Sequence, residues 1–257
     1  MLHLAWIIPL LPLAACAVLI FFGSALRHRM GERVGWIGVA GIAATIPFSV
    51  GCLVELMLGA SSVDVTAVWG HIGSRALEVG YAVDPLGAVM LSMVSIVATC
   101  IQVYSIGYMH GDARFQRFFA YLSLFCACMF TLVLANNFVM IYGGWELVGL
   151  CSYLLIGFWY DRSPESQVDK VAPYQAGMKA FMTTRVADVI LILGIAYLWA
   201  STGTLSFREI FFSEATLHML AETPAVGGFL GLSAAGLIGI CIVIGTIGKS
   251  AQFPLHV

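Results

Sequence analysis

Charged side chains are scarce in this sequence. Lysine, arginine, aspartate and glutamate make up 10% of the 257 residues, whereas soluble domains carry about 25%. Hydrophobic residues make up 60%, and the mean hydropathy is +0.95. The formal net charge is −2 and the basic residues form no patch, so nothing points to nucleic acid as a partner. These proportions predict an integral membrane protein.

Signatures of cofactor binding are also missing. No glycine-rich nucleotide turn follows a strand, so we expect this chain to bind neither NADH nor flavin. Its seven cysteines all lie inside apolar runs and form no array for an iron–sulfur cluster. Cys126 and Cys128 would lie about 200° apart on a helix, so they cannot share a metal ion. We expect the cysteines to be small core residues, with no cofactor or metal site in this chain.

The two ends of the sequence carry few signals. No basic residue precedes Arg27, which argues against a cleaved signal peptide and predicts a retained first span in Met1–Gly23. The last apolar run begins near Val226 and continues to Val257 without a polar loop. From this run we expect the sequence to stop inside a span.

The apolar runs predict an all-α membrane bundle of about seven transmembrane helices rather than a barrel. Ser62–Asp84 differs in kind, because apolar residues alternate with others on both sides of a turn at Gly70–Arg75. This pattern predicts a β-hairpin outside the membrane. Thr202–Ala225 is expected to be a loop. The expected spans are Leu4–Gly23, Val34–Leu58, Leu86–Ile106, Phe118–Leu134, Asn137–Trp159, Tyr174–Ser201 and the run from Val226.

Basic residues are unevenly shared between the two sets of loops. One set holds only Arg75 and Arg208, and the other holds Arg27, Arg29, Arg33, Arg114, Arg117, Arg162 and Lys170. The positive-inside rule then places the N-terminus, the hairpin and the Thr202–Ala225 loop outside, and the arginine-rich loops in the cytoplasm.

The span Asn137–Trp159 carries a single charged residue, Glu146. At about 1.5 Å per residue its carboxylate would lie roughly 15 Å deep, close to the midplane of a core about 30 Å thick. An ionised group there needs a partner or water. Gly143 and Gly149 on the same face would let another helix approach, so we expect Glu146 to point into the bundle. The alternative is a protonated structural carboxyl.

Lys179, Arg185, Asp188 and Lys249 are the further candidates within the expected spans. Lys179 lies close to the cytoplasmic end on a different face, where an ordinary snorkelling lysine is the alternative. Arg185 and Asp188 are spaced three apart on one helix face, with Asp188 near the depth of Glu146; a structural ion pair is the alternative reading. Lys249 would lie more than about 30 Å along a straight helix from Val226 and could snorkel to the surface. Pro254, however, breaks helical hydrogen bonding, and broken helices in membranes line polar sites. A buried Glu146 and a buried Lys249 beside a break suggest a proton pathway.

Four motifs carry a resemblance to a known family. RFFAYLSLF (Arg117–Phe125), GGWELVGLCSYLLIGFW, MKAFMTTRVADV (Met178–Val189) and GKSAQFPLH (Gly248–His256) occur in this order. From about Asp84 onward the sequence closely resembles subunit L of bacterial NADH:quinone oxidoreductase, the antiporter-like subunit of respiratory complex I that is called chain 5 in mitochondria. The resemblance implies that Glu146 and Lys249 form a proton-handling pair that Asp188 and Arg185 modulate. It also implies a seventh helix that is discontinuous near Lys249, and a hairpin that contacts neighbouring subunits.

The resemblance has consequences for partners and location. It implies a proton-translocating subunit without a redox centre, while NADH, FMN, iron–sulfur clusters and quinone are used by other subunits. Partners would be other membrane subunits, the lipid bilayer and protons, in a bacterial plasma membrane or, alternatively, an organelle inner membrane. We expect residues 1–83 to form two spans plus the hairpin, and residues 84–257 to form the third span and a first antiporter-like repeat, truncated in the seventh span.

The sequence also departs from the family pattern. Leu147 and Ala187 stand where the family usually has glycine, and the loop Arg162–Gln175 is longer than in most members. A second inverted repeat is absent from the sequence. The large subunit of a multisubunit Na⁺/H⁺ antiporter shares these motifs and is the alternative function. A seven-span receptor or passive scaffold would fit the number of spans but not the charges inside them.

Overall fold

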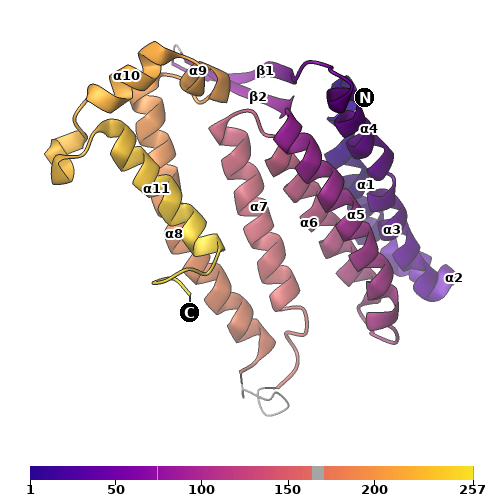
Figure 1. Cartoon of the computed structure of the whole chain (residues 1–257). Coiled ribbons are helices and arrows are strands. Elements are labelled where there is room, and N and C mark those ends of the chain that lie inside the picture. The colour runs from indigo at the N-terminus through magenta and orange to yellow at the C-terminus, as the bar shows by residue number, and fades with distance from the viewer. Residues whose placement is uncertain (74, 164–170, 257) are drawn as a thin grey trace.

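The computed structural model describes residues 1–73, 75–163 and 171–256. Within them the chain is a helical bundle with a two-stranded sheet across one end (Figure 1). Six segments of the described chain are long and apolar enough to cross a membrane, and a seventh apolar helix has 16 residues. The expected helical membrane bundle with a hairpin is confirmed. The six segments are Leu2–Phe21, Gly23–Met57, Pro85–Tyr108, Phe115–Leu134, Phe138–Ile156 and Pro173–Thr202.

The first two spans contain short helices because prolines and glycines interrupt them. The second span divides into α3 and α4 at Ala44–Thr45. Pro47 explains the break, since its ring lacks an N–H and clashes with the carbonyl four residues earlier, that of Ala43. The elements of this part are the single-turn helix Leu2–Leu4, α1 (Ile7–Phe21), α2 (Gly23–Met30), the turn Gly31–Val34, α3 (Gly35–Ala43) and α4 (Ile46–Met57).

The hairpin consists of β1 (Val63–Ile72) and β2 (Arg75–Val83), which pair antiparallel with Val63 opposite Val83. The strands reach further than the sequence suggested, because the expected turn at Gly70–Arg75 contains strand residues on both sides. The register shifts between Val68 and Gly70, as at a β-bulge. Position 74, in the turn itself, lies outside the described residues.

Four long helices follow, in the order expected: α5 (Pro85–Tyr108), α6 (Phe115–Leu134), α7 (Phe138–Ile156) and α8 (Pro173–Thr202). The side chain of Asp84 caps α5, and that of Asn137 caps α7 by accepting from the Met140 N–H. In Figure 1, α7 stands between α8 and the group of helices before it. Residues 164–170, and with them the prediction for Lys170, lie outside the described residues.

The segment after α8 differs from expectation. The expected loop Thr202–Ala225 contains two short helices, α9 (Phe207–Phe211) and α10 (Glu214–Glu222). A 3₁₀ turn, Val226–Gly231, comes next, and the seventh helix, α11 (Ala234–Lys249), begins about two turns later than predicted. Three glycines at positive φ, at 227, 228 and 231, keep this stretch out of the α-helix.

α11 packs closely along α8. A Cβ on Gly194 of α8 would lie 2.5 Å from the Cβ of Cys241, and Gly248 is packed just as closely against Ala187. Small residues at both crossings let the two backbones approach. Ala187, one of the departures from the family pattern, is thus accommodated by a glycine on the facing helix. Leu147, the other departure, is 46% exposed on α7.

The cysteines are mostly core residues, as expected. Cys16, Cys52, Cys126, Cys128 and Cys151 are buried, Cys241 is half-buried, and Cys100 is exposed on α5. The prediction is therefore wrong for Cys100, whose side chain faces the outside of the bundle.

Asn136, in the turn between α6 and α7, ties the sheet to the bundle. Its Nδ2 donates to Asp64 Oδ1 at 2.7 Å and to Thr66 Oγ1 at 3.0 Å, both on β1. Its carbonyl accepts from the Phe207 N–H, and the next-but-one residue, Phe138, donates to the Leu205 carbonyl. The start of α7 is thereby joined to the hairpin on one side and to the segment after α8 on the other.

At the opposite end of the bundle, the loops after α5 and α7 are held together by polar contacts. Arg114 donates to Asp161 Oδ1 at 2.5 Å, and Trp159 Nε1 donates to Asp112 Oδ2 at 2.9 Å. The guanidinium of Arg162 lies over the Trp159 ring at 3.9 Å. The Arg114 guanidinium holds the pKa of the Asp161 carboxyl below its usual range.

Candidate functional site

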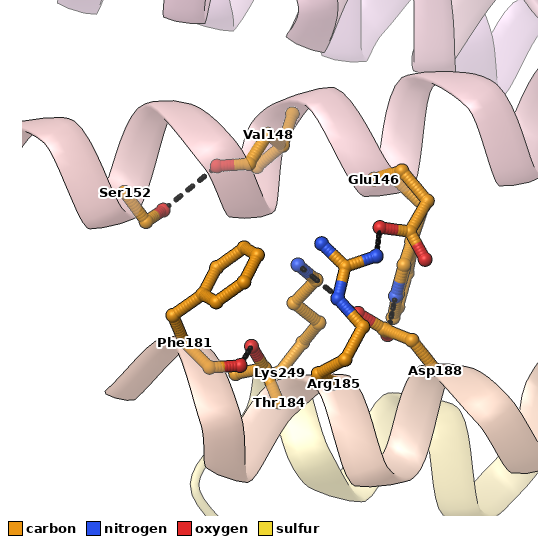
Figure 2. Close-up of polar contacts among 9 residues, drawn as sticks. Glu146, Val148, Ser152, Phe181, Thr184, Arg185, Asp188 and Lys249 are labelled. Carbon is orange, nitrogen blue, oxygen red and sulfur yellow. Dashed lines mark hydrogen bonds and ion pairs between the residues drawn. The ribbon is translucent and has the colours of Figure 1, made fainter. Parts of the chain in front are cut away.

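The four ionisable residues singled out in the sequence come together between α7, α8 and α11. Figure 2 shows Glu146 reaching from one helix toward Arg185, Asp188 and Lys249. Glu146 lies near the middle of α7, and Lys249 is the last residue of α11. Because α11 begins late, Lys249 lies at the level of Asp188, in the middle of α8. The sequence could not decide the depth of Lys249; the structure places it inside the bundle.

Glu146 is paired with Arg185. The guanidinium donates to Glu146 Oε2, and the side chains of the two residues are 18% and 37% exposed. The Arg185 guanidinium also lies 4.5 Å from the centre of the Phe181 ring, one turn earlier on α8. A carboxylate in the middle of a span therefore has a cationic partner, as its position requires.

Asp188 is paired with Lys249. Its side chain is only 2% exposed, and Oδ2 lies 3.9 Å from Lys249 Nζ. Its other oxygen, Oδ1, accepts a hydrogen bond of 2.7 Å from Trp145 Nε1. The separation of 3.9 Å is longer than a direct hydrogen bond, so the carboxylate and the ammonium attract each other without one.

The expected direct pair of Glu146 and Lys249 is replaced by two pairs, each made with α8. The reason lies in the packing: α8 contacts both α7 and α11. Arg185 and Asp188, one turn apart on α8, each meet the opposite charge that comes from a different neighbouring helix. The four residues lie together, and their ion pairs are Glu146 with Arg185 and Asp188 with Lys249. The role of Glu146 and Lys249 as a proton-handling pair stays a prediction.

Two buried polar atoms in this cluster have no hydrogen-bond partner among the described residues: Glu146 Oε1 and Lys249 Nζ. These atoms belong to the two residues that the sequence predicts to pair. A Cβ on Gly149, one turn from Glu146 on α7, would overlap the Lys249 ammonium. The lysine therefore already lies against the helix that carries Glu146, and both groups retain the capacity for one more partner.

The glycines of α7 have different roles from those expected. Gly149 makes room for a lysine side chain rather than for a helix backbone. Gly143 has no neighbouring atom within 4 Å of its Cβ position in the described structure, and Gly144 instead packs against Leu132 of α6. Close packing of α7 on α6 thus uses the glycine next to the one predicted.

Trp145 is a further residue of the site, and it was not predicted from the sequence. Its indole N–H bonds Asp188, and its ring centre lies 5.8 Å from Lys249 Nζ. A signal was available, since a tryptophan in a membrane helix needs an acceptor for its N–H and this one is adjacent to Glu146. In the part of the chain that the structure describes, no three His, Cys, Asp or Glu residues are grouped to hold a metal ion.

Two family models match most of this fold. Residues 69–119 match "NADH-Ubiquinone oxidoreductase (complex I), chain 5 N-terminus". Residues 135–257 match "NADH:quinone oxidoreductase/Mrp antiporter, TM". The second match contains all four charged residues of the cluster.

Curated relatives match nearly the whole chain, and not only the part after Asp84. NAD(P)H-quinone oxidoreductase chain 5 of Synechocystis sp. is 40% identical over 99% of this chain and 36% of its own length. The chloroplastic subunit 5 of Zygnema circumcarinatum is 40% identical over 98% of this chain and 34% of its own length. The chain spans about a third of the length of these relatives.

Solved structures share the fold at lower identity. One is a membrane-bound sulfane sulfur reductase, described as an archaeal respiratory membrane complex (TM-score 0.68, 20% identity, 97% of this chain and 34% of that one). Another is the Mrp complex of Dietzia sp. (TM-score 0.67, 22% identity, 99% of this chain and 24% of that one). Both have the arrangement of helices found here.

Proposed function

The chain belongs to the family of antiporter-like membrane subunits of NADH:quinone oxidoreductase, and we propose that it carries protons across the membrane as part of such a complex. The observation behind the proposal is the cluster of Glu146, Arg185, Asp188 and Lys249, which three helices bring together inside the bundle. Ionisable residues at that depth are costly, and they mark proton pathways in membrane proteins.

In the proposed mechanism, Lys249 is the residue that is loaded and unloaded with a proton. Its Nζ lies 3.9 Å from Asp188 Oδ2 and against Gly149, whose helix also carries Glu146. Burial favours the neutral amine, whereas a nearby carboxylate favours the ammonium. Movement of Nζ toward the unpartnered Glu146 Oε1, and back to Asp188, changes the charge that it meets. Arg185 sets how strongly Glu146 attracts the lysine, because it already holds Oε2.

The energy for this movement comes, in this proposal, from redox chemistry in other subunits, which use NADH or a related nucleotide, FMN, iron–sulfur clusters and quinone. The four sequence motifs assign to this chain only the membrane part of that process. Its partners are other antiporter-like membrane subunits, which the hairpin would contact. The asymmetry of arginines supports an orientation with the N-terminus and hairpin outside and the Arg114 and Arg162 loops in the cytoplasm.

Replacement of Glu146 in the full-length subunit of the assembled complex tests the proposal. Glu146→Gln keeps the shape but cannot hold a charge, so we expect proton translocation in inverted vesicles to fall strongly while quinone reduction and subunit content persist. Glu146→Asp should keep part of the pumping. Glu222→Gln is the control, since Glu222 is 81% exposed at the sheet end. Normal pumping with Gln at position 146 would refute the proton-relay role.

Sodium–proton exchange is the alternative, because one matching family model names the Mrp antiporter beside the oxidoreductase. The two activities differ in what drives proton movement. A proton flux that follows an imposed Na⁺ gradient without quinone reduction would favour the antiporter. A flux that needs the nucleotide and quinone, and not Na⁺, would favour the oxidoreductase.

A further inference from the structure

Trp145 is the uncharged member of the intramembrane cluster, and its indole N–H donates a hydrogen bond to Asp188. The distance from Nε1 to Oδ1 is 2.7 Å, and the Asp188 side chain is only 2% exposed. An indole N–H donates and never accepts. Oδ1 therefore has a fixed donor in the structure, and water has little access to compete for it.

The position of Oδ2 follows from this bond. With Oδ1 held by Trp145, Oδ2 is the oxygen that faces Lys249, at 3.9 Å from Nζ. When Nζ moves within hydrogen-bond distance of Oδ2 and a proton passes from Lys249 to Asp188, an N–H bond of the ammonium breaks and an O–H bond forms at Oδ2. The products are a neutral amine and a neutral carboxylic acid, and the hydrogen bond at Oδ1 changes from charge-assisted to ordinary strength.

The ring of Trp145 acts in the same direction. Lys249 Nζ lies 5.8 Å from the ring centre, within the range in which an aromatic face attracts a cation. Loss of the proton removes that attraction. Both contacts of this side chain therefore favour the charged pair, Asp188 carboxylate with Lys249 ammonium, over the neutral pair.

We propose that Trp145 is a positioning residue of the proton pathway, which directs proton exchange with Lys249 to Asp188 Oδ2 and holds the pair in its charged form. This inference rests on the proposed function of the cluster. The adjacent residue, Glu146, binds Arg185, so two consecutive residues of α7 bind Arg185 and Asp188 of α8. Its effect passes through Asp188 and Lys249.

The test removes the indole N–H without changing the shape of the side chain. In the full-length subunit of the assembled complex, Trp145 is replaced by 3-benzothienylalanine, in which sulfur stands in place of the N–H, and separately by Phe. The readout is the infrared band of a protonated carboxyl, assigned to Asp188 by its loss in Asp188→Asn. We expect the neutral form of Asp188 to increase about tenfold or more, because a hydrogen bond to a charged group is lost, and pumping to fall with quinone reduction intact.

Trp159 provides a matched control, since its Nε1 also donates to an aspartate, Asp112 Oδ2 at 2.9 Å, in a loop outside the spans. The same replacements there should leave the Asp188 band unchanged. An unchanged band with benzothienylalanine at position 145 would overturn the inference, including when Glu146→Gln abolishes pumping and the proposed function stands. Normal pumping in Glu146→Gln would instead overturn the proposed function, whatever the band shows.

Discussion

The ammonium of Lys249 lies in the space that a Cβ of Gly149 would occupy. This contact joins the end of α11 to the middle of α7. The two helices otherwise have different main packing partners, α8 for α11 and α6 for α7. It brings the lysine to the helix that carries Glu146, although the ion pair of Lys249 is with Asp188. Glycine at position 149 is therefore a requirement of the lysine position and not of helix–helix packing.

Gly149→Ala should displace the Lys249 ammonium and reduce proton translocation by about tenfold, the effect of about 1.4 kcal/mol on one step. Subunit content and quinone reduction should be unchanged, because only the far end of a flexible side chain has to move. Gly143→Ala is the matched control: it lies on the same helix, and no described atom is within 4 Å of its Cβ position. Equal pumping in the two variants would contradict this account of Gly149.

Asn136→Ala should loosen the hairpin. Asn136 Nδ2 donates to Asp64 Oδ1 at 2.7 Å and to Thr66 Oγ1 at 3.0 Å, and its side chain is buried. Loss of these bonds leaves acceptors without their donor, at a cost of about 1–3 kcal/mol. We expect faster hydrogen exchange in β1 and less assembled subunit, measured by mass spectrometry and by subunit content.

Exchange of the amide and the carboxylate between positions 136 and 64 tests whether their hydrogen bond holds the hairpin. Asn136→Asp places a second carboxylate beside Asp64 and should be worse than Asn136→Ala. Adding Asp64→Asn to Asn136→Asp restores a donor and an acceptor, so the double variant should recover hairpin protection. A double variant that is no better than Asn136→Asp alone would show that the Asn136–Asp64 bond does not hold the hairpin.

The contact of Arg114 with Asp161 should weaken in acid. The Arg114 guanidinium lowers the pKa of Asp161, so this contact stabilises the folded loop above the ordinary aspartate pKa of about 3.9 and is lost as pH falls through the lower, folded value. Hydrogen exchange around residues 158–162 should therefore rise only below about pH 4. Asp161→Asn should remove this pH dependence, whereas Glu222→Gln, at the sheet end, should preserve it.

Cysteine labelling should establish the orientation. His71 in the hairpin, Glu214 in α10 and His28 in α2 are exposed. With the proposed topology, cysteines at positions 71 and 214 react with an impermeant reagent from outside, and one at position 28 reacts only from inside. The reverse pattern would invert the orientation and the direction of the proposed pathway.

Much of the architecture follows from local patterns in the sequence. Alternation of apolar residues was sufficient to predict the hairpin, and the length of the apolar runs was sufficient to predict α5 to α8. Asp84 marks the start of α5 and Asn137 that of α7, as N-caps. The depth of Glu146 and of Asp188 followed from counting residues along their helices. These features depend on neighbouring residues, which is why the sequence reveals them.

The pairing of charges depends on how whole helices are rotated and could not be read in the same way. Glu146 meets Arg185 because α8 contacts both α7 and α11, and nothing in the spacing of Lys249 indicates this. The depth of Lys249 depended on three glycines with positive φ that delay the start of α11. Trp145 was missed because a tryptophan in an apolar run resembles any other core residue until its N–H partner is known.

Trp145 and Glu146 bind Asp188 and Arg185, and these two contacts restrain the position of α7 relative to α8. Two adjacent residues bound to two groups one turn apart prevent both axial sliding and rotation of α7 against α8. The group that can still move is the four-carbon side chain of Lys249, at the C-terminal end of α11. Side-chain rotamer changes take picoseconds to nanoseconds, far less than the millisecond scale of an enzyme turnover. The two positions of Lys249 Nζ, at Asp188 and at Glu146, would then be in equilibrium throughout each cycle. The fraction of time spent at each carboxylate, rather than the rate of exchange, would set the number of protons moved per cycle.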